Sequence, residues 1–261
     1  MAGLSIFFKG GSQTRLFLSL PTASLSLMPY ALPILAFIIA ATPFGLIIGR
    51  MVKGIDIREH GSGNIGTTNV FRVLGMWPGI ICLILDILKG FIPVVLAINL
   101  LQFGDRQPIP HLAFLDSMRT TLPESRQFFV QMVHIITALF AILGHNYSPW
   151  LGFKGGKGIA TSLGVLLALM PFAALILVLL FLIVFLITRY VSLASIIAAG
   201  SLPLLTLWGS WHHGRIQDGT WNIPLFMFSL AIGILAIWKH RSNIQRLRNG
   251  TENRFSKKTK A

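Results

Sequence analysis

Predominantly apolar segments of about 17 residues or more constrain this chain more strongly than any other feature. A helix of that length matches the hydrocarbon thickness of a bilayer, and it satisfies its own backbone hydrogen bonds, which lipid cannot do. Hydrophobic residues make up 54% of the 261-residue chain, and charged residues only 11%. The sequence therefore predicts an all-α polytopic membrane protein.

The apolar segments predict about seven transmembrane helices. Segment 159–187 is apolar for 29 residues and is broken only at Met170 and Pro171. As one helix it would measure about 43 Å at 1.5 Å per residue, which is well beyond the hydrocarbon core. We therefore expect a hairpin of two short helices that turns near Pro171. The other spans are expected at residues 30–48, 77–101 and 128–143, in a segment that follows "TRYVSLAS" and ends near Gly209, and at 223–238.

Positive charge predicts the sidedness of the chain. The net charge is +14, and the basic residues gather in short segments between the spans and in the tail from Lys239 onward. The positive-inside rule accounts for this pattern without a nucleic-acid partner, and it places the carboxyl end in the cytoplasm and the amino end outside. The expected parts are a flexible extension (1–29), a seven-helix transmembrane domain (30–238) with an extracytoplasmic connector (102–127), and a basic cytoplasmic tail (239–261).

The single cysteine, Cys82, lies inside an apolar segment, where a buried thiol is the simplest interpretation. One cysteine excludes a disulfide within the chain and a metal cluster built from cysteines. We therefore expect a monomer in the lipid bilayer, without covalent links between subunits.

Four polar segments share one chemical character, and the expected topology brings them all to the cytoplasmic face. Glycines let backbone N–H groups turn toward a ligand, hydroxyls and amides add donors, and Lys and Arg supply positive charge, as a phosphate-type anion requires. The run "KGGKG" (154–158) lacks the earlier glycine and the Ser or Thr of a nucleotide P-loop. A flexible basic loop that anchors lipid headgroups is the alternative. The segments are "GSGNIGTTNVFR", "GHNYSPWLGFKGGKGIATS", "RYVSLAS" and "KHRSNIQRLRNGTENR".

Several polar residues have both a structural and a functional interpretation. Asp86 and Lys89 are three residues apart in an apolar span, so they share a helix face and can neutralise each other, either as support for a site or as part of it. His240 and Asn243 share one helical turn that can face a site. Glu252 is the only acidic residue of the tail, and a solvated partnership with Arg248 is its structural interpretation.

The motifs "GSGNIGTTNVFRVLG", "LGHNYSPWLGFKGGKGIATSLG", "RYVSLAS", "HRSNIQRLRNGTE" and "LDILKG" together resemble the bacterial acyl-phosphate:glycerol-3-phosphate acyltransferases, the PlsY family. The resemblance extends from about Pro43 to Glu252, apart from the connector. It implies a multi-pass enzyme of the bacterial inner (plasma) membrane with a cytoplasmic active site. Such an enzyme transfers a fatty acyl group from acyl phosphate to glycerol 3-phosphate, which gives lysophosphatidic acid and phosphate early in phospholipid biosynthesis. No cofactor or metal is expected, and an acyl-phosphate-producing enzyme is an expected functional partner.

The resemblance also implies the site residues. Proton removal from the acceptor hydroxyl falls either to His240 or to the acyl phosphate itself, and the choice stays open. The positions that match those holding the phosphates and reacting groups are Ser62, Arg72, Lys154 or Lys157, Ser192, His240 and Asn243, with Lys157 placed in the catalytic set. Phosphate contacts are expected from Gly61, Gly63, Asn64, Thr68, Asn69, His145, Lys154, Gly155, Gly156, Gly158 and Glu252.

The sequence also has features that fit two alternative functions. The same anion site could belong to a membrane transporter for phosphate or glycerol 3-phosphate, but polar residues within the spans are sparse. The pairs His111/Asp116 and His213/Asp218 have the H-x4-D spacing of another glycerolipid acyltransferase superfamily. Both pairs fall in loops expected on the opposite side of the membrane, so we interpret them as coincidental.

Overall fold

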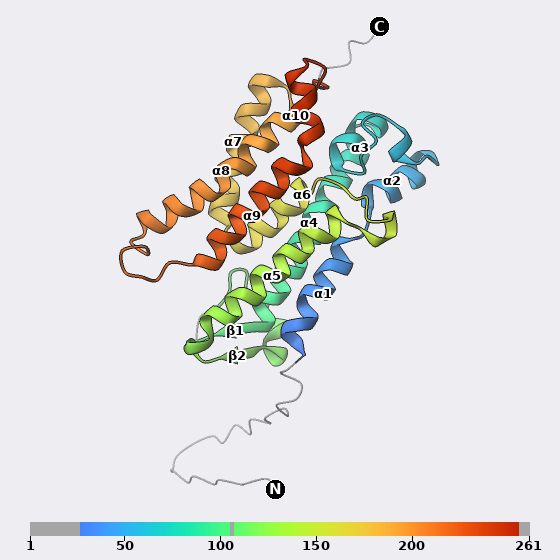
Figure 1. Ribbon diagram of the computed structural model, residues 1–261. Coiled ribbons are helices and arrows are strands. Elements are labelled where there is room, and N and C mark those ends of the chain that lie inside the picture. Colours follow the sequence, from blue (N-terminus) through green and yellow to red (C-terminus); the bar gives the residue numbers. More distant parts are fainter. Residues whose placement is uncertain (1–26, 105–106, 256–261) are drawn as a thin grey trace, which may run out of the picture.

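A computed structural model describes residues 27–104 and 107–255. The described part is an elongated bundle of helices (Figure 1). Residues 1–26 of the expected amino-terminal extension and residues 256–261 of the expected tail lie outside it. The helices are α1 (Met28–Ala40), α2 (Phe44–Lys53), α3 (Thr67–Leu74), α4 (Met76–Leu100), α5 (Gln127–Asn146), α6 (Ile159–Leu169), α7 (Pro171–Thr188), α8 (Val191–His212), α9 (Ile223–Lys239) and α10 (Arg241–Arg248).

Five helical segments of the described residues are long and apolar enough to cross a membrane. A sixth results if α9 and α10, which bend by 55° at their junction, count as one span, and α6 is a shorter apolar helix. The break between α6 and α7 falls at Met170, as the sequence predicts, because Pro171 lacks the N–H that would continue α6. The total of seven spans stays a prediction. The five segments are Met28–Lys53, Met76–Leu100, Glu124–Leu151, Pro171–Thr188 and Val191–His212.

The first predicted span is two helices and not one, because the chain breaks at residues 41–43. Pro43 has no N–H to bond the preceding turn, so α1 ends before it. The break leaves carbonyl groups available: Ala41 accepts a hydrogen bond from Ser148 Oγ at 2.6 Å, and Thr42 accepts one from Lys89 Nζ at 2.8 Å. The break therefore ties α1 to α4 and to the segment that follows α5.

The connector contains the part of the fold that an all-α prediction misses. Strand β1 (Leu101–Phe103) pairs in parallel with β2 (Thr120–Leu122). Three-residue strands are too short to show an alternating pattern, which explains the omission. Asn99 fastens the connector to α4, because its side chain accepts from Leu112 N at 2.8 Å and donates to Pro110 O at 3.1 Å. Short 3-10 turns lie at Ile57–Glu59, Ala113–Met118, Glu124–Arg126 and Pro149–Leu151.

Glycines allow α4 and α6 to approach each other closely, as small residues do between transmembrane helices. A Cβ atom on Gly90 of α4 would overlap the Thr161 carbonyl, and a Cβ on Gly164 of α6 would overlap the Ile87 carbonyl. The two helices are thus fixed at backbone contact. This contact determines where the amino end of α6, with the Lys157 segment before it, lies relative to α4.

We expect Gly164→Ala to push α6 away from α4 and to destabilise the protein by about 1–3 kcal/mol. Gly209→Ala is the matched control, since a Cβ there meets no atom within 4 Å, and helix propensity favours Ala over Gly. Thermal unfolding in detergent measures both variants. Unfolding of Gly164→Ala at the wild-type temperature would contradict the role given to this contact.

Candidate active site

One cavity of about 640 Å³ joins the polar motifs to the interior of the helix bundle. Its polar wall comes from the loop before α3, from α3 itself, from the start of α6 and α8, and from α10 with the following tail. Its apolar wall comes from α4, α6, α7, α8 and α9. The polar lining side chains are Ser62, Asn64, Thr67, Thr68, Asn69, Arg72, Asp86, His145, Lys157, Ser162, Ser192, Ser195, His240, Asn243, Arg246 and Glu252.

Glu252 holds three segments together at the polar end. Its Oε1 accepts hydrogen bonds from Ser192 Oγ at 2.9 Å and from Asn243 Nδ2 at 2.7 Å, and its Oε2 accepts from Arg246 Nε at 2.7 Å. Burial acts to raise the pKa of Glu252, but these three donors outweigh it, so the pKa is lowered and the group stays ionised. The alternative, structural interpretation of Glu252 as a solvated partner of Arg248 is wrong, because the ion pair is made with Arg246.

Thr67, Ser162 and Ser195 line the cavity although they were not among the predicted site residues. The most consequential residue missing from the prediction is the cation Arg246. It lines the cavity from α10, one turn beyond Asn243. A signal was present, because residues three apart in a helix share a face, and the face of Asn243 had already been assigned to the site.

Lys157 extends the network of Glu252 toward α6. Its ammonium donates to Asn243 Oδ1 at 2.5 Å. Burial is the main cause that lowers the pKa of Lys157 to about 8, and the positive charges of Arg246 and Arg72 add to it. Lys154 is exposed and does not line the cavity. Of the two lysines left open by the sequence, the cavity therefore contains Lys157.

Arg72 approaches the same end of the cavity from α3. Its Nη2 donates to the Asn253 carbonyl at 3.2 Å, and its guanidinium lies 5.9 Å from the centre of the Phe255 ring. Burial lowers the pKa of Arg72, an effect that Glu252 opposes. The residues after α10 thus connect α3 with the carboxyl-terminal helices.

The glycines of the run 154–158 serve mainly to pack the chain, which corrects the expected roles of two of them. Gly155 N donates to Asn146 O at 3.2 Å and Gly156 N to His145 O at 3.1 Å, so neither N–H is available to a phosphate. A Cβ on Gly156 would overlap the His145 imidazole. Gly158, with φ of +82°, leads into α6, whose first N–H groups have no partner within the helix.

The Asn69 side chain makes its hydrogen bonds within the loop before α3 and not to a ligand. Its Nδ2 donates to the carbonyls of Ile57, His60 and Asn64 at 3.0, 3.0 and 2.9 Å, and its Oδ1 accepts from Ser62 N at 2.8 Å. The three carbonyls share the two hydrogens of Nδ2, so no donor of Asn69 is left for a ligand. We therefore assign Asn69 a positioning role in place of the expected phosphate contact.

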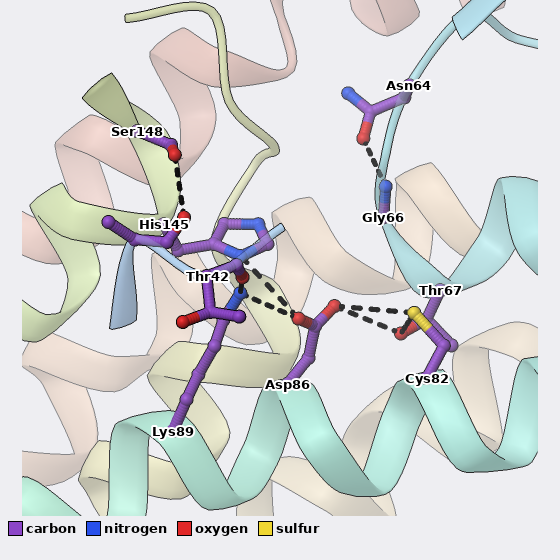
Figure 2. Close-up of polar contacts among 10 residues, drawn as sticks. Thr42, Asn64, Gly66, Thr67, Cys82, Asp86, Lys89, His145 and Ser148 are labelled. Carbon is purple, nitrogen blue, oxygen red and sulfur yellow. Dashed lines mark hydrogen bonds and ion pairs between the residues drawn. The ribbon is translucent and has the colours of Figure 1, made fainter. Parts of the chain in front are cut away.

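Some neighbours of Asn69 form the turn before α3, and others line the cavity. Gly61 and Gly63 adopt φ of +61° and +69°, conformations that favour glycine, and they form the turn without lining the cavity. Asn64 Oδ1 accepts from Gly66 N at 2.8 Å (Figure 2). Ser62, Asn64 and Thr68 line the cavity, so they retain their expected place.

His240 lies at the bend between α9 and α10. Its Nδ1 is 2.8 Å from the Ala236 carbonyl, and because a carbonyl can only accept, Nδ1 carries the proton. Burial is the main cause that lowers the pKa of His240 to about 4. At neutral pH the ring is therefore uncharged, and Nε2 is left as a hydrogen-bond acceptor.

A buried charged cluster lies beside the polar end of the cavity (Figure 2). Asp86 Oδ1 pairs with Lys89 Nζ at 2.8 Å and lies 3.8 Å from His145 Nδ1. Asp86 Oδ2 accepts from Thr67 Oγ1 at 3.4 Å. Asp86 and His145 line the cavity, whereas Lys89 lies behind them. The cluster supports the site from within the bundle.

The H-x4-D pairs lie away from the cavity. His111 Nε2 contacts Asp116 Oδ1 at 2.9 Å in the connector, and neither residue lines the cavity. Asp218 accepts hydrogen bonds from Thr220, and it makes no contact with His213 in the described part of the chain. The geometry agrees with the interpretation of both pairs as coincidental.

Apolar helices surround a cavity that has a cationic end and an apolar wall. These features are those of a membrane-embedded protein with a site suited to an amphipathic anion. Residues 30–250 match the family model described as glycerol-3-phosphate acyltransferase. The chain therefore belongs to the glycerol-3-phosphate acyltransferase family. This assignment confirms the predicted enzyme class and sets aside the transport alternative.

Curated relatives and solved structures agree with the family. The glycerol-3-phosphate acyltransferases of Fusobacterium nucleatum and Geobacter sulfurreducens are 40% and 42% identical to this chain. The alignments cover 85% and 84% of this chain and 95% and 94% of the relatives. The crystal structure of PlsY (YgiH), an integral membrane glycerol 3-phosphate acyltransferase, in its glycerol 3-phosphate form is 36% identical, with a TM-score of 0.69 over 87% of this chain and 96% of that one. Its lysophosphatidic acid form gives a TM-score of 0.67.

Because the pKa of Lys157 is lowered to about 8, its positive charge is present at pH 7 and is lost as the pH rises through 8. We expect the affinity for glycerol 3-phosphate to fall several-fold between pH 7 and pH 9, as a nearby charge is lost. Lys157→Arg should bind without this fall, and Lys154→Arg should behave as wild type. Calorimetric titrations across this pH range measure the effect, and an equal fall in Lys157→Arg would contradict it.

Proposed function

We propose that this protein transfers a fatty acyl group from acyl phosphate to glycerol 3-phosphate, which yields lysophosphatidic acid and inorganic phosphate. One observation carries the proposal: the cationic and apolar regions form a single continuous cavity. An acyl phosphate has both characters, a dianionic head and a hydrocarbon chain. A site for it requires this combination at the edge of a bilayer.

The apolar region has the composition that an acyl chain needs. Leu177 and Phe181 of α7, Leu202 of α8 and Ile232 of α9 line it. Each methylene that leaves water for such a surface contributes about 0.8 kcal/mol. The chain of the donor therefore anchors the substrate here and holds its phosphate at the polar end.

The polar end supplies what the reaction needs. In the transfer, a hydroxyl oxygen of glycerol 3-phosphate bonds to the acyl carbon, the bond from that carbon to the phosphate oxygen breaks, and phosphate leaves with the electron pair. Lys157, Arg72 and Arg246 surround this region and stabilise negative charge on the leaving phosphate. A mixed anhydride already has a good leaving group, so binding both anions in the correct orientation supplies most of the catalysis.

The acceptor hydroxyl must lose one proton during the transfer. His240, uncharged and lining the cavity, offers Nε2 as acceptor, and the phosphate oxygens of the donor are the alternative. Ser192 and Asn243, held by Glu252, are proposed to orient the acceptor. Ser62 and Thr68 are proposed to contact a phosphate from α3 and the loop before it.

We also propose that the end of the bundle with α2, α3 and α10 faces the cytoplasm and that β1 and β2 face outward (Figure 1). The grouping of Arg50, Lys53, Lys157 and the basic α10 at the first end supports this orientation in a bacterial inner membrane. The proposal keeps seven spans, residues 102–127 as an outer connector, residues 239–261 as a cytoplasmic tail, and a monomer. An enzyme that produces acyl phosphate would have to supply the donor.

Detergent-purified protein should form lysophosphatidic acid from palmitoyl phosphate and glycerol 3-phosphate. We expect Arg72→Ala and Lys157→Ala to lower kcat/KM by about 100-fold or more, as loss of a preorganised charge at a developing anion does. Lys154→Ala and His111→Ala should remain near wild type, since both residues lie outside the cavity. Size-exclusion profiles and thermal unfolding serve as folding controls. Substantial activity in both Arg72→Ala and Lys157→Ala would overturn the proposed roles.

A further inference from the structure

Two full charges are buried beside the cavity, and the proposed chemistry uses neither. Asp86 is 2% exposed and Lys89 is 3% exposed, both within α4. An isolated charge at such a position is costly, so the two groups depend on each other. Buried charges in a transmembrane helix, unlike those of a solvated surface, call for a functional explanation.

The charged pair is held by groups from three further segments. Lys89 Nζ donates to Thr42 O, at the break between α1 and α2, at 2.8 Å. The hydroxyl of Thr67, at the start of α3, donates to Asp86 Oδ2 at 3.4 Å. The ring of His145, near the end of α5, completes the enclosure at 3.8 Å from Asp86 Oδ1. This arrangement fixes the carboxylate in one place.

The fixed carboxylate lies on the wall of the anion site. Asp86, Thr67 and Lys157 line the same cavity. The His145 imidazole lies between Asp86 and the backbone of Gly156, which immediately precedes Lys157. A negative charge on this wall acts against the binding of any phosphate, and the ammonium of Lys89 is the cation paired with it.

We propose that Lys89 is a positioning residue of the phosphate site: it neutralises the Asp86 carboxylate and so prevents the cavity wall from repelling anionic substrates. The proposal rests on the assignment of the polar end as a phosphate site. Lys89 acts through Asp86 and does not itself line the cavity.

The size of the effect follows from Coulomb's law. At an effective dielectric constant of about 20, a unit charge roughly 10 Å from an anion changes its affinity by about tenfold. We therefore expect Lys89→Met to raise KM for glycerol 3-phosphate or for palmitoyl phosphate about tenfold, with a smaller change in kcat. Asp86→Asn should leave both KM values within about twofold of wild type, because a buried lysine without its partner loses its proton, which leaves the cavity wall uncharged.

The double variant Asp86→Asn/Lys89→Met distinguishes charge from packing. Once the carboxylate is removed, the missing ammonium no longer leaves a negative charge, so KM should return most of the way to the wild-type value. Lys89→Arg should also preserve KM. Arg119→Met is the matched control, because it removes a cation from an exposed aspartate partner, Asp116, in the connector.

A purely structural role predicts another pattern. Asp86→Asn would then impair binding as strongly as Lys89→Met, and the double variant would be worse than either single change. That result would overturn the proposal. If Lys89→Met does not fold, the neutral Lys89→Gln takes its place with the same expected rise in KM, while Asp86→Asn and the double variant test the structural alternative.

A binding measurement separates this proposal from the proposed reaction. The increase in unfolding temperature produced by glycerol 3-phosphate, or by inorganic phosphate, reports affinity without turnover. Wild-type protein that binds phosphate but does not use acyl phosphate would refute only the donor assignment. An equal ligand-induced increase in wild type and Lys89→Met would refute only the role of Lys89.

Discussion

The carboxylate of Glu252 accepts hydrogen bonds from Ser192, Asn243 and Arg246, and the assembly of the polar site depends on these bonds. They connect the start of α8, the helix α10 and the tail, which lie about 60 residues apart along the chain at the extremes. Asn243 in turn accepts a hydrogen bond from Lys157, which lies just before α6. Through this chain of bonds, cations that would otherwise repel one another are held around one cavity.

The second constraint is the close packing at the ends of α5 and α6. Gly155 N donates to the Asn146 carbonyl and Gly156 N to the His145 carbonyl, so the run of glycines lies directly against α5. The backbone contact of Gly90 and Gly164 fixes α6 against α4. Together these contacts determine the position of Lys157 and of the helix terminus beside it. The glycines therefore act on the site through geometry, and the first N–H groups of α6 have no acceptor within the helix, as at any helix amino terminus.

Features set by local composition were predictable from the sequence. The apolar runs indicate the helices, and Pro171 marks the break after α6, because hydrophobic length and a missing N–H act without reference to the rest of the fold. Pro43 marks the break at residues 41–43 in the same local way, although the prediction of one continuous span passed over it. The contacts that fix the break come from distant partners, Lys89 and Ser148. The membership in the acyltransferase family followed from four polar motifs in their order.

The roles of individual polar residues depend on the direction in which each side chain points, which the sequence alone does not specify. Lys154 and Lys157 are chemically identical, and only the path of the backbone places one in solvent and the other in the cavity. Asn69 has the donors of a phosphate ligand, yet its own loop uses all of them. Arg246 shares a helix face with Asn243, and its hydrogen bond to Glu252 shows that this face points into the site.

The central claim is that one cavity accepts the phosphate and the acyl chain of the same donor. Lysophosphatidic acid formation by the purified protein tests it most directly. Palmitoyl phosphate is compared with palmitoyl-CoA and palmitoyl-acyl carrier protein, each with and without glycerol 3-phosphate and without added metal, and phosphate release is followed for palmitoyl phosphate. The account predicts acyl transfer from palmitoyl phosphate alone, with phosphate released only when glycerol 3-phosphate is present. Transfer from a thioester but not from acyl phosphate would contradict it.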